Sequence, residues 1–367
     1  MGRFSSVFLL LLAACGDNVV GDGAGPYPVD DVDPSGNATA TPRYVPSVCG
    51  AQSWTTNITG DLSMNVSVAS RADGAAVLAT PRAGGSLTGF VLDTRMNMVS
   101  VNKIPIDGAF TQVVASVIGD RVVSTAIEHD AVHVHLLDND LGDPHYTPKL
   151  PGSYLGEPAF YQAQADLVMP IAGDDGLWMH RFDSSFVVQD SIQLLATAPA
   201  TSMTAAQMGV ATLTAWSTAN DECFMMLTST FHPGPYAKLP VACDSPRLAV
   251  DRNTGDGVMV FDSADGVRMM DIAGTQLGVQ SRLVRPDTRS PRALFDGANH
   301  WVSYLDARGD IIVGFLDADR KPVTMSLAHP KPEVGAYEMV LVDGSPWVFA
   351  LGAEGYTAHR MCVDAQW

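Results

Sequence analysis

Residues 311–317 read Ile-Ile-Val-Gly-Phe-Leu-Asp, a short run of apolar residues that ends in an aspartate and follows a turn rich in Asp and Gly at 306–310. Six other segments repeat this pattern of an apolar run with a polar or Cys end. They are LTGFVLD (87–93), VHVHLLD (132–138), LWMHRFD (177–183), CFMMLTS (223–229), VRMMD (267–271) and YTAHRMC (356–362). Along the chain the segments end 45, 45, 46, 42, 46 and 45 residues apart. The sequence is therefore an array of seven similar units.

Each unit contains enough short apolar runs for four strands. In the sixth unit we assign strands to 293–296, 300–305, 311–317 and 323–328. The runs are bounded by Gly and Asp, which supply the positive φ that tight hairpins need, and helical periodicity is absent. A repeat of 40 to 50 residues made of four antiparallel strands is typical of a propeller blade, which must pack against its neighbours to bury its faces. The sequence predicts an all-β fold, a seven-bladed β-propeller.

The seventh unit lacks a fourth strand because only five residues follow Cys362. Ahead of the first unit, residues 53–59 (Ser-Trp-Thr-Thr-Asn-Ile-Thr) resemble a strand without a blade. An unpaired sheet edge needs cover. We therefore expect this N-terminal segment to become the outer strand of the last blade and to close the ring.

Four of the five cysteines test this arrangement. Cys362 ends the last third strand and Cys49 lies just before the proposed closing strand, while Cys223 begins the third strand of the fourth unit and Cys243 is expected to close its fourth. Four cysteines allow three pairings. The strand assignment selects Cys49–Cys362 and Cys223–Cys243.

The fifth cysteine belongs to a different motif. Residues 1–15 contain one positive charge, a short apolar stretch from Val7, and then Leu12-Ala13-Ala14-Cys15. This stretch resembles the lipobox of bacterial lipoproteins, in which the signal peptide is cut before the cysteine and the thiol is lipidated. The apolar stretch is too short to span a bilayer. The resemblance implies a signal peptide at 1–14, a lipidated Cys15 bearing acyl chains such as palmitate, and an oxidising compartment that suits disulfides.

Residues 15–46 are rich in Gly, Asp, Pro, Ala and Thr and contain few large apolar side chains. Such a segment buries too little surface to fold and predicts a flexible tether. The expected organisation is a signal peptide at 1–14, a lipidated tether at 15–46 and a propeller at 47–367.

Lipoproteins with Asp directly after the cysteine tend to stay in the inner membrane. This chain has Gly16 there, so the resemblance favours the outer membrane.

The formal net charge of −18 opposes binding to nucleic acid or to anionic lipid headgroups. Phosphate-binding Gly loops, Gly-x-Ser-x-Gly, His-Glu-x-x-His and Cys-x-x-Cys motifs are all missing from the sequence. Nothing in it indicates a cofactor, and whether the protein is an enzyme stays open.

Ser-Pro-Arg occurs at 245–247 and again at 290–292, where the chain starts the innermost strand of units five and six. One interpretation is that Arg247 and Arg292 face one mouth of the central channel and bind a carboxylate or another anion. The other is a repeated turn whose arginines pair with neighbouring acids.

Histidines cluster at His129, His133 and His135. His133 and His135 share one face of a strand, where two imidazoles hold zinc or copper if a third ligand, His129 or His145, joins them. His135, however, has equivalents at His180 and His359 in other units, which favours packing between sheets. The Trp and Met residues of the second and third strands are likewise expected in the core between blades, with a sugar-stacking platform as the alternative.

These features predict a monomeric, lipid-anchored protein of the bacterial cell envelope. We expect its propeller to be a non-catalytic binding or scaffolding module for a protein or glycan partner. The alternative is an envelope hydrolase or lyase with its active site at the channel mouth.

Overall fold

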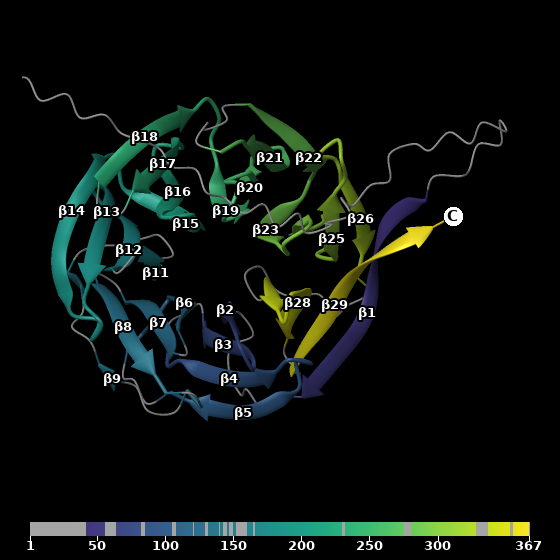
Figure 1. Cartoon of the computed structure of the whole chain (residues 1–367), viewed down its shortest axis with the longest axis horizontal. Coiled ribbons are helices and arrows are strands. Elements are labelled where there is room, and N and C mark those ends of the chain that lie inside the picture. Colours follow the sequence, from purple (N-terminus) through teal and green to yellow (C-terminus); the bar gives the residue numbers. More distant parts are fainter. Residues whose placement is uncertain are drawn as a thin grey trace, which may run out of the picture. The chain divides into compact units, whose positions relative to one another are not determined.

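The computed structural model describes residues 42–366 apart from 56–63, 82–84, 105–107, 120, 129–130, 139, 142–144, 147–149, 152–159, 164–165, 230–231, 275–279, 328–336 and 353–354. The predicted signal peptide, Cys15 and most of the predicted tether lie outside these residues. In the described part, the unit 43–366 consists of seven antiparallel sheets arranged in a ring (Figure 1). The predicted all-β, seven-bladed propeller is confirmed. None of the described segments is an apolar helix of membrane-spanning length.

The blades follow the chain. Blade 1 contains β2 (Met64–Arg71), β3 (Gly74–Pro81), β4 (Thr88–Asp93) and β5 (Met98–Lys103). Blade 2 contains β6 (Gln112–Ile118), β7 (Arg121–Glu128), β8 (Ala131–Leu137), β9 (His145–Tyr146) and β10 (Leu150–Pro151). Blade 3 contains β11 (Tyr161–Ala163), β12 (Asp166–Gly173), β13 (Gly176–Phe182) and β14 (Val188–Ala196). Blade 4 contains β15 (Ala200–Met208), β16 (Ala211–Thr218), β17 (Cys223–Ser229) and β18 (His232–Leu239).

The remaining blades continue in the same way. Blade 5 contains β19 (Asp244–Val250), β20 (Gly257–Ser263), β21 (Gly266–Ile272) and β22 (Ser281–Pro286). Blade 6 contains β23 (Arg289–Phe295), β24 (His300–Leu305), β25 (Ile311–Leu316) and β26 (Pro322–Ser326). Blade 7 contains β27 (Tyr337–Val342), β28 (Ser345–Gly352) and β29 (Gly355–Gln366), and it is completed by β1 (Arg43–Thr55).

The first and last strands of the ring pair with each other, as predicted. β1 runs antiparallel to β29, with Trp54 opposite Tyr356 and Arg43 opposite Gln366. β1 starts ten residues before the predicted position, within the segment that composition had assigned to the tether. Its prolines misled that assignment, yet Pro46 is tolerated because β1 is an edge strand. Tyr44 packs against the core between blades 6 and 7, which is why this polar-looking segment is ordered.

The core lies between the blades, and each apolar cluster joins two neighbouring sheets. Between blades 3 and 4, for example, Trp216 is fully buried and stacks on Phe224 with ring centroids 5.3 Å apart. The methionine pairs of β17 and β21 are buried in the same way. Most of these Trp and Met side chains therefore pack in the core and offer no exposed stacking platform.

The aspartate that ends the third strand caps the turn that follows it. The Oδ1 atom of Asp183 accepts hydrogen bonds from the backbone N–H groups of Ser185 (2.8 Å) and Val187 (3.0 Å), and Asp93 does the same in blade 1. The residue three positions after the aspartate takes a positive φ, 61° at Phe186. Phe186 is thereby turned into the core against blade 2. The repeated aspartate is structural.

Replacement of Asp183 by Ala is expected to destabilise the protein by about 2 kcal/mol, because two backbone donors lose a charged acceptor and the strained turn loses its cap. Asp319→Ala is the matched control: Asp319 lies in the equivalent turn of blade 6 and, among the described residues, its side chain makes only an exposed ion pair with Lys321. Urea unfolding monitored by tryptophan fluorescence measures both. Equal effects of the two substitutions would contradict the capping role.

Candidate functional site on the inner strands of blades 4 to 7

The two Ser-Pro-Arg segments form the same local structure at the start of β19 and β23. Ser245 and Ser290 have positive φ values of 46° and 55°, and the strand register shifts at both places. In each segment the arginine Nη1 donates to the carbonyl of the preceding proline, at 3.1 Å in β19 and 2.9 Å in β23. The sequence repeat thus marks a repeated bulge on neighbouring inner strands.

Arg292 is bonded to the next blade. It is only 6% exposed, its Nε donates to Oε2 of Glu338 at 3.0 Å, and its guanidinium lies over the Tyr337 ring at 5.0 Å. The Tyr337 hydroxyl donates to the carbonyl of Ser290, which links blade 7 back to blade 6. Arg292 therefore has its counter-ion within the ring, and an external anion would have to compete with Glu338.

Asp262 lies at the end of β20, opposite Asp244 of β19. Its Oδ2 accepts from the backbone N–H of Ser290 at 3.0 Å, across the boundary between blades 5 and 6. Its Oδ1 is buried and has no hydrogen-bond partner among the described residues. Burial raises the pKa of Asp262 to about 6: the Ser290 N–H and the guanidinium groups of Arg292 and Arg247 oppose this shift, and the Asp244 charge adds to it.

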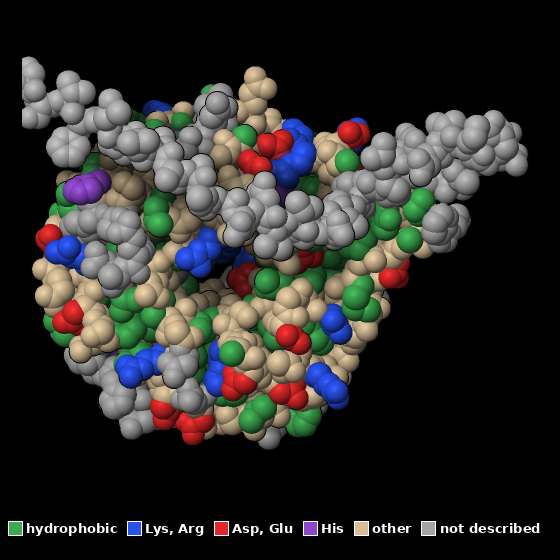
Figure 2. All heavy atoms as spheres, in the orientation of Figure 1, with side chains coloured by type: hydrophobic (Ala, Val, Ile, Leu, Met, Phe, Trp, Pro, Cys, Tyr) green, Lys and Arg blue, Asp and Glu red, His purple; other side chains and the backbone are tan. Residues whose placement is uncertain are grey.

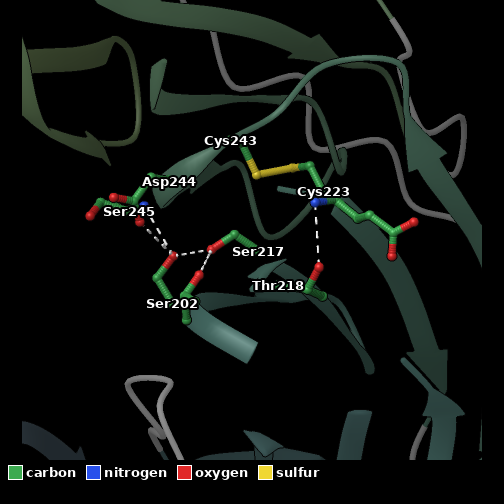
Figure 3. The surroundings of a disulfide bond; sticks show 9 residues. Ser202, Ser217, Thr218, Cys223, Cys243, Asp244 and Ser245 are labelled. Atoms are coloured by element: carbon green, nitrogen blue, oxygen red, sulfur yellow. Dashed lines mark hydrogen bonds between the residues drawn. A yellow bond between two sulfur atoms is a disulfide. The ribbon is translucent and has the colours of Figure 1, made fainter. Parts of the chain in front are cut away.

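A hydroxyl network joins blades 4 and 5 next to these groups (Figure 3). Ser202 Oγ lies 2.6 Å from Ser217 Oγ, accepts from the backbone N–H of Ser245 at 3.0 Å, and lies 3.3 Å from Asp244 Oδ1. The Cys223–Cys243 disulfide ends one residue before Asp244 and so anchors the start of β19. Cys243 itself lies four residues beyond the end of β18, in the connection between blades, and does not close the outer strand.

The second disulfide is Cys49–Cys362, also with the predicted pairing. It joins β1 to β29 at a register shift of β1 between Val48 and Gly50. The bond crosses the closure of the ring, between residues 313 positions apart.

His133 and His135 share one face of β8, as predicted, and there they pack against each other and against Phe110. Their rings stack with centroids 6.0 Å apart, and Phe110 meets both edge-on. His133 Nε2 lies 3.1 Å from Oε2 of Glu128. Among the described residues no group of three potential ligands is arranged to hold a metal. His129 and the side chain of His145 lie outside the described residues.

The inner-strand groups belong to one end of the ring, where outer strands lead into the next blade. Figure 2 shows a hollow near the middle of the ring, with basic and acidic side chains on its visible wall. Arg247 and Arg292 stand out in the sequence through the repeated Ser-Pro-Arg, whereas Asp262 and Glu338 do not. No sequence signal distinguishes these acids, since their importance comes from contacts between blades.

No known protein family model matches the chain, and no curated protein sequence matches it. Solved structures do. One, described as the crystal structure of BBS1N in complex with ARL6DN, soaked with mercury, superposes with a TM-score of 0.59 at 9% sequence identity. The match covers 87% of this chain and 97% of the other. At this identity the likeness concerns the fold, which agrees with the propeller described above.

Proposed function

We propose that this chain is a lipid-anchored lipoprotein of the bacterial cell envelope, located at the outer membrane. We further propose that its propeller is monomeric and is a non-catalytic binding or scaffolding module for a protein or glycan partner. The binding role rests on the way in which the polar side chains of the inner strands are hydrogen-bonded. Arg292, Glu338 and Tyr337 bond to one another or to backbone across blades, which stiffens the ring instead of presenting reactive groups. The resemblance of residues 12–15 to a lipobox supports the anchor.

A rigid ring with connections on both faces is well suited to hold a partner. The structurally similar BBS1N was solved in a complex with ARL6DN, so a ring of this kind engages a protein in at least one case. Fold likeness alone does not transfer a partner. The similarity therefore supports the class of function and leaves the identity of the partner to experiment.

One observation favours the alternative, an envelope hydrolase or lyase. Asp262 is a carboxyl with a pKa of about 6 beside a second carboxyl, Asp244, and such pairs perform acid–base chemistry in many enzymes. However, the unpartnered Oδ1 of Asp262 is buried, so a substrate would not reach it in this conformation. Binding is the better-supported function.

The anchor is tested by labelling cells that express the chain with a palmitate analogue. We expect the wild-type protein to be labelled and to sediment with outer membranes, and Cys15→Ser to lose both properties. Capture of partners from detergent-solubilised membranes, with the wild-type protein as bait, then tests the binding role. Unlabelled, soluble wild-type protein would contradict the anchor, and turnover of an envelope polymer by the purified protein would favour the alternative.

A further inference from the structure

The boundary between blades 5 and 6 carries polar groups at both ends. At one end Arg320 occupies the turn position that holds buried Phe186 in blade 3, and its Nε donates to Asp271 Oδ1 at 3.1 Å. Arg320 Nη1 also lies 3.1 Å from His300 Nδ1. At the other end, the Oδ2 atom of Asp262 accepts a hydrogen bond from the Ser290 backbone N–H. The apolar cluster of this boundary contains several valines and includes Met269 and Tyr304.

Asp262 is linked by hydrogen bonds to blade 6 and, through it, to blade 7. The Ser290 N–H that it accepts from belongs to the positive-φ bulge that leads into Arg292, and Arg292 holds Glu338 of blade 7. A buried carboxylate oxygen without a donor is costly, and the cost is smaller when the group binds a proton and becomes neutral.

We propose that Asp262 is a proton-controlled lock on this end of the boundary: the protonated form favours the closed boundary because the buried Oδ1 then carries no unsolvated charge, whereas the ionised form favours an opening that lets water reach Oδ1 and loosens the Ser290 bulge and the Arg292–Glu338 pair. This regulation would act on the boundary whatever partner the protein serves.

The neighbouring charges set the direction of the effect. Asp244 of β19 faces Asp262 and repels its ionised form, whereas Arg247 of β19 and Arg292 of β23 attract it, and from β27 the buried Tyr337 phenol is near enough to feel its charge. The balance leaves the pKa of Asp262 at about 6, above its ordinary 3.8. A raised carboxyl pKa means that the closed boundary binds the proton more tightly than the open one. The contribution is complete below pH 3.8 and is lost as the pH rises through 6.

The shift in the pKa of Asp262 sets how strongly the opening of the boundary depends on pH. If Asp262 regains its ordinary pKa when the boundary opens, raising the pH from 5.0 to 7.5 increases the opening equilibrium constant about tenfold. The change is opposite in sign to that expected from the buried histidines of blades 2 and 3, which weaken the protein in acid. The lock can therefore be told apart from global unfolding.

Hydrogen–deuterium exchange of the full chain, followed by mass spectrometry of peptides covering 287–295, tests the lock. After correction for the intrinsic exchange rates, we expect wild-type protection in this segment to fall about tenfold between pH 5.0 and pH 7.5, and Asp262→Asn to remove that dependence. Asp287→Asn is the control: Asp287 is exposed and has a positive φ of 53°, which Asn tolerates, so the wild-type dependence should remain.

If Asp262→Asn does not fold, Asp244→Asn provides the second test. Removal of the facing charge lowers the pKa of Asp262 and should shrink the pH dependence. A flat wild-type profile, an unchanged profile in Asp262→Asn, or an unchanged profile in Asp244→Asn would each overturn the proposal. None of these outcomes depends on the anchor or on a partner.

Discussion

Acidification from pH 7 to pH 5 is expected to lower the free energy of unfolding by about 4 kcal/mol through two buried histidines. His135 in blade 2 is 1% exposed and His180 in blade 3 is 4% exposed. Burial is the main cause that lowers the pKa of each to about 4, and the neighbouring His133 adds to the shift at His135. Both stay neutral in the folded protein at pH 5, whereas in the unfolded chain they protonate near pH 6.5.

The sign follows from proton binding. Between pH 6.5 and 4 the unfolded chain holds more protons than the folded protein, so stability falls as the pH falls through this window. Each histidine contributes about 2 kcal/mol by pH 5. Asp262 works in the opposite direction and offsets about 1 kcal/mol of the loss, because its folded-state pKa is raised.

Urea unfolding at pH 7 and pH 5 measures this loss. His135→Gln and His180→Gln, made separately, should each remove about 2 kcal/mol of a net dependence of about 3 kcal/mol, although each lowers stability at pH 7 through poorer packing. His232→Gln is the control because His232 is exposed on β18. If both single variants kept the full wild-type dependence, these histidines would not be its source.

Removal of the Cys49–Cys362 disulfide is expected to cost about 5 kcal/mol, more than removal of Cys223–Cys243, for which about 3 kcal/mol is expected. In the chain-entropy model the effect grows with the length of the closed loop, and the two bonds join residues 313 and 20 positions apart. The longer loop contains the whole ring. Without the bond, β1 is held in blade 7 by strand pairing and by the packing of Tyr44.

The paired variants Cys49→Ser with Cys362→Ser, and Cys223→Ser with Cys243→Ser, are matched because each removes one disulfide by the same two substitutions. Chemical unfolding ranks them, and limited proteolysis reports whether β1 detaches first. We expect cleavage near residues 43–55 only in the first pair. An equal loss of stability in the two pairs would show that ring closure does not depend on the bond.

The repeat and the positions of most strands follow from the sequence because each strand is a short apolar run bounded by turn residues. Both cysteine pairings were predicted correctly, although Cys49 and Cys362 lie inside β1 and β29 and Cys243 lies beyond β18, whereas strand ends were expected there. The strand assignment failed where local composition and tertiary context disagree. β1 begins at Arg43, among residues that look like a tether, because pairing with β29 and packing of Tyr44 order a segment with few apolar side chains.

In the candidate site, too, some features follow from the sequence and others only from contacts between blades. The Ser-Pro-Arg repeat at 245–247 and 290–292 was visible as a sequence equivalence, and it does form one bulge twice. Glu338 had no such signal: it becomes the partner of Arg292 only because blade 7 packs beside blade 6. The weak metal motif of blade 2 likewise became a packing cluster once Phe110 lay against both rings.

By itself, the sequence determined the all-β class, the number of blades and the pairing of the cysteines, because these depend on spacing along the chain. Only the tertiary structure decided where β1 begins, which acid faces Arg292 and that Asp262 holds its proton more tightly than an ordinary aspartate. The reason is physical: burial, counter-ions and hydrogen-bond partners come from neighbouring blades some 45 residues away, and they exist only once the ring has closed.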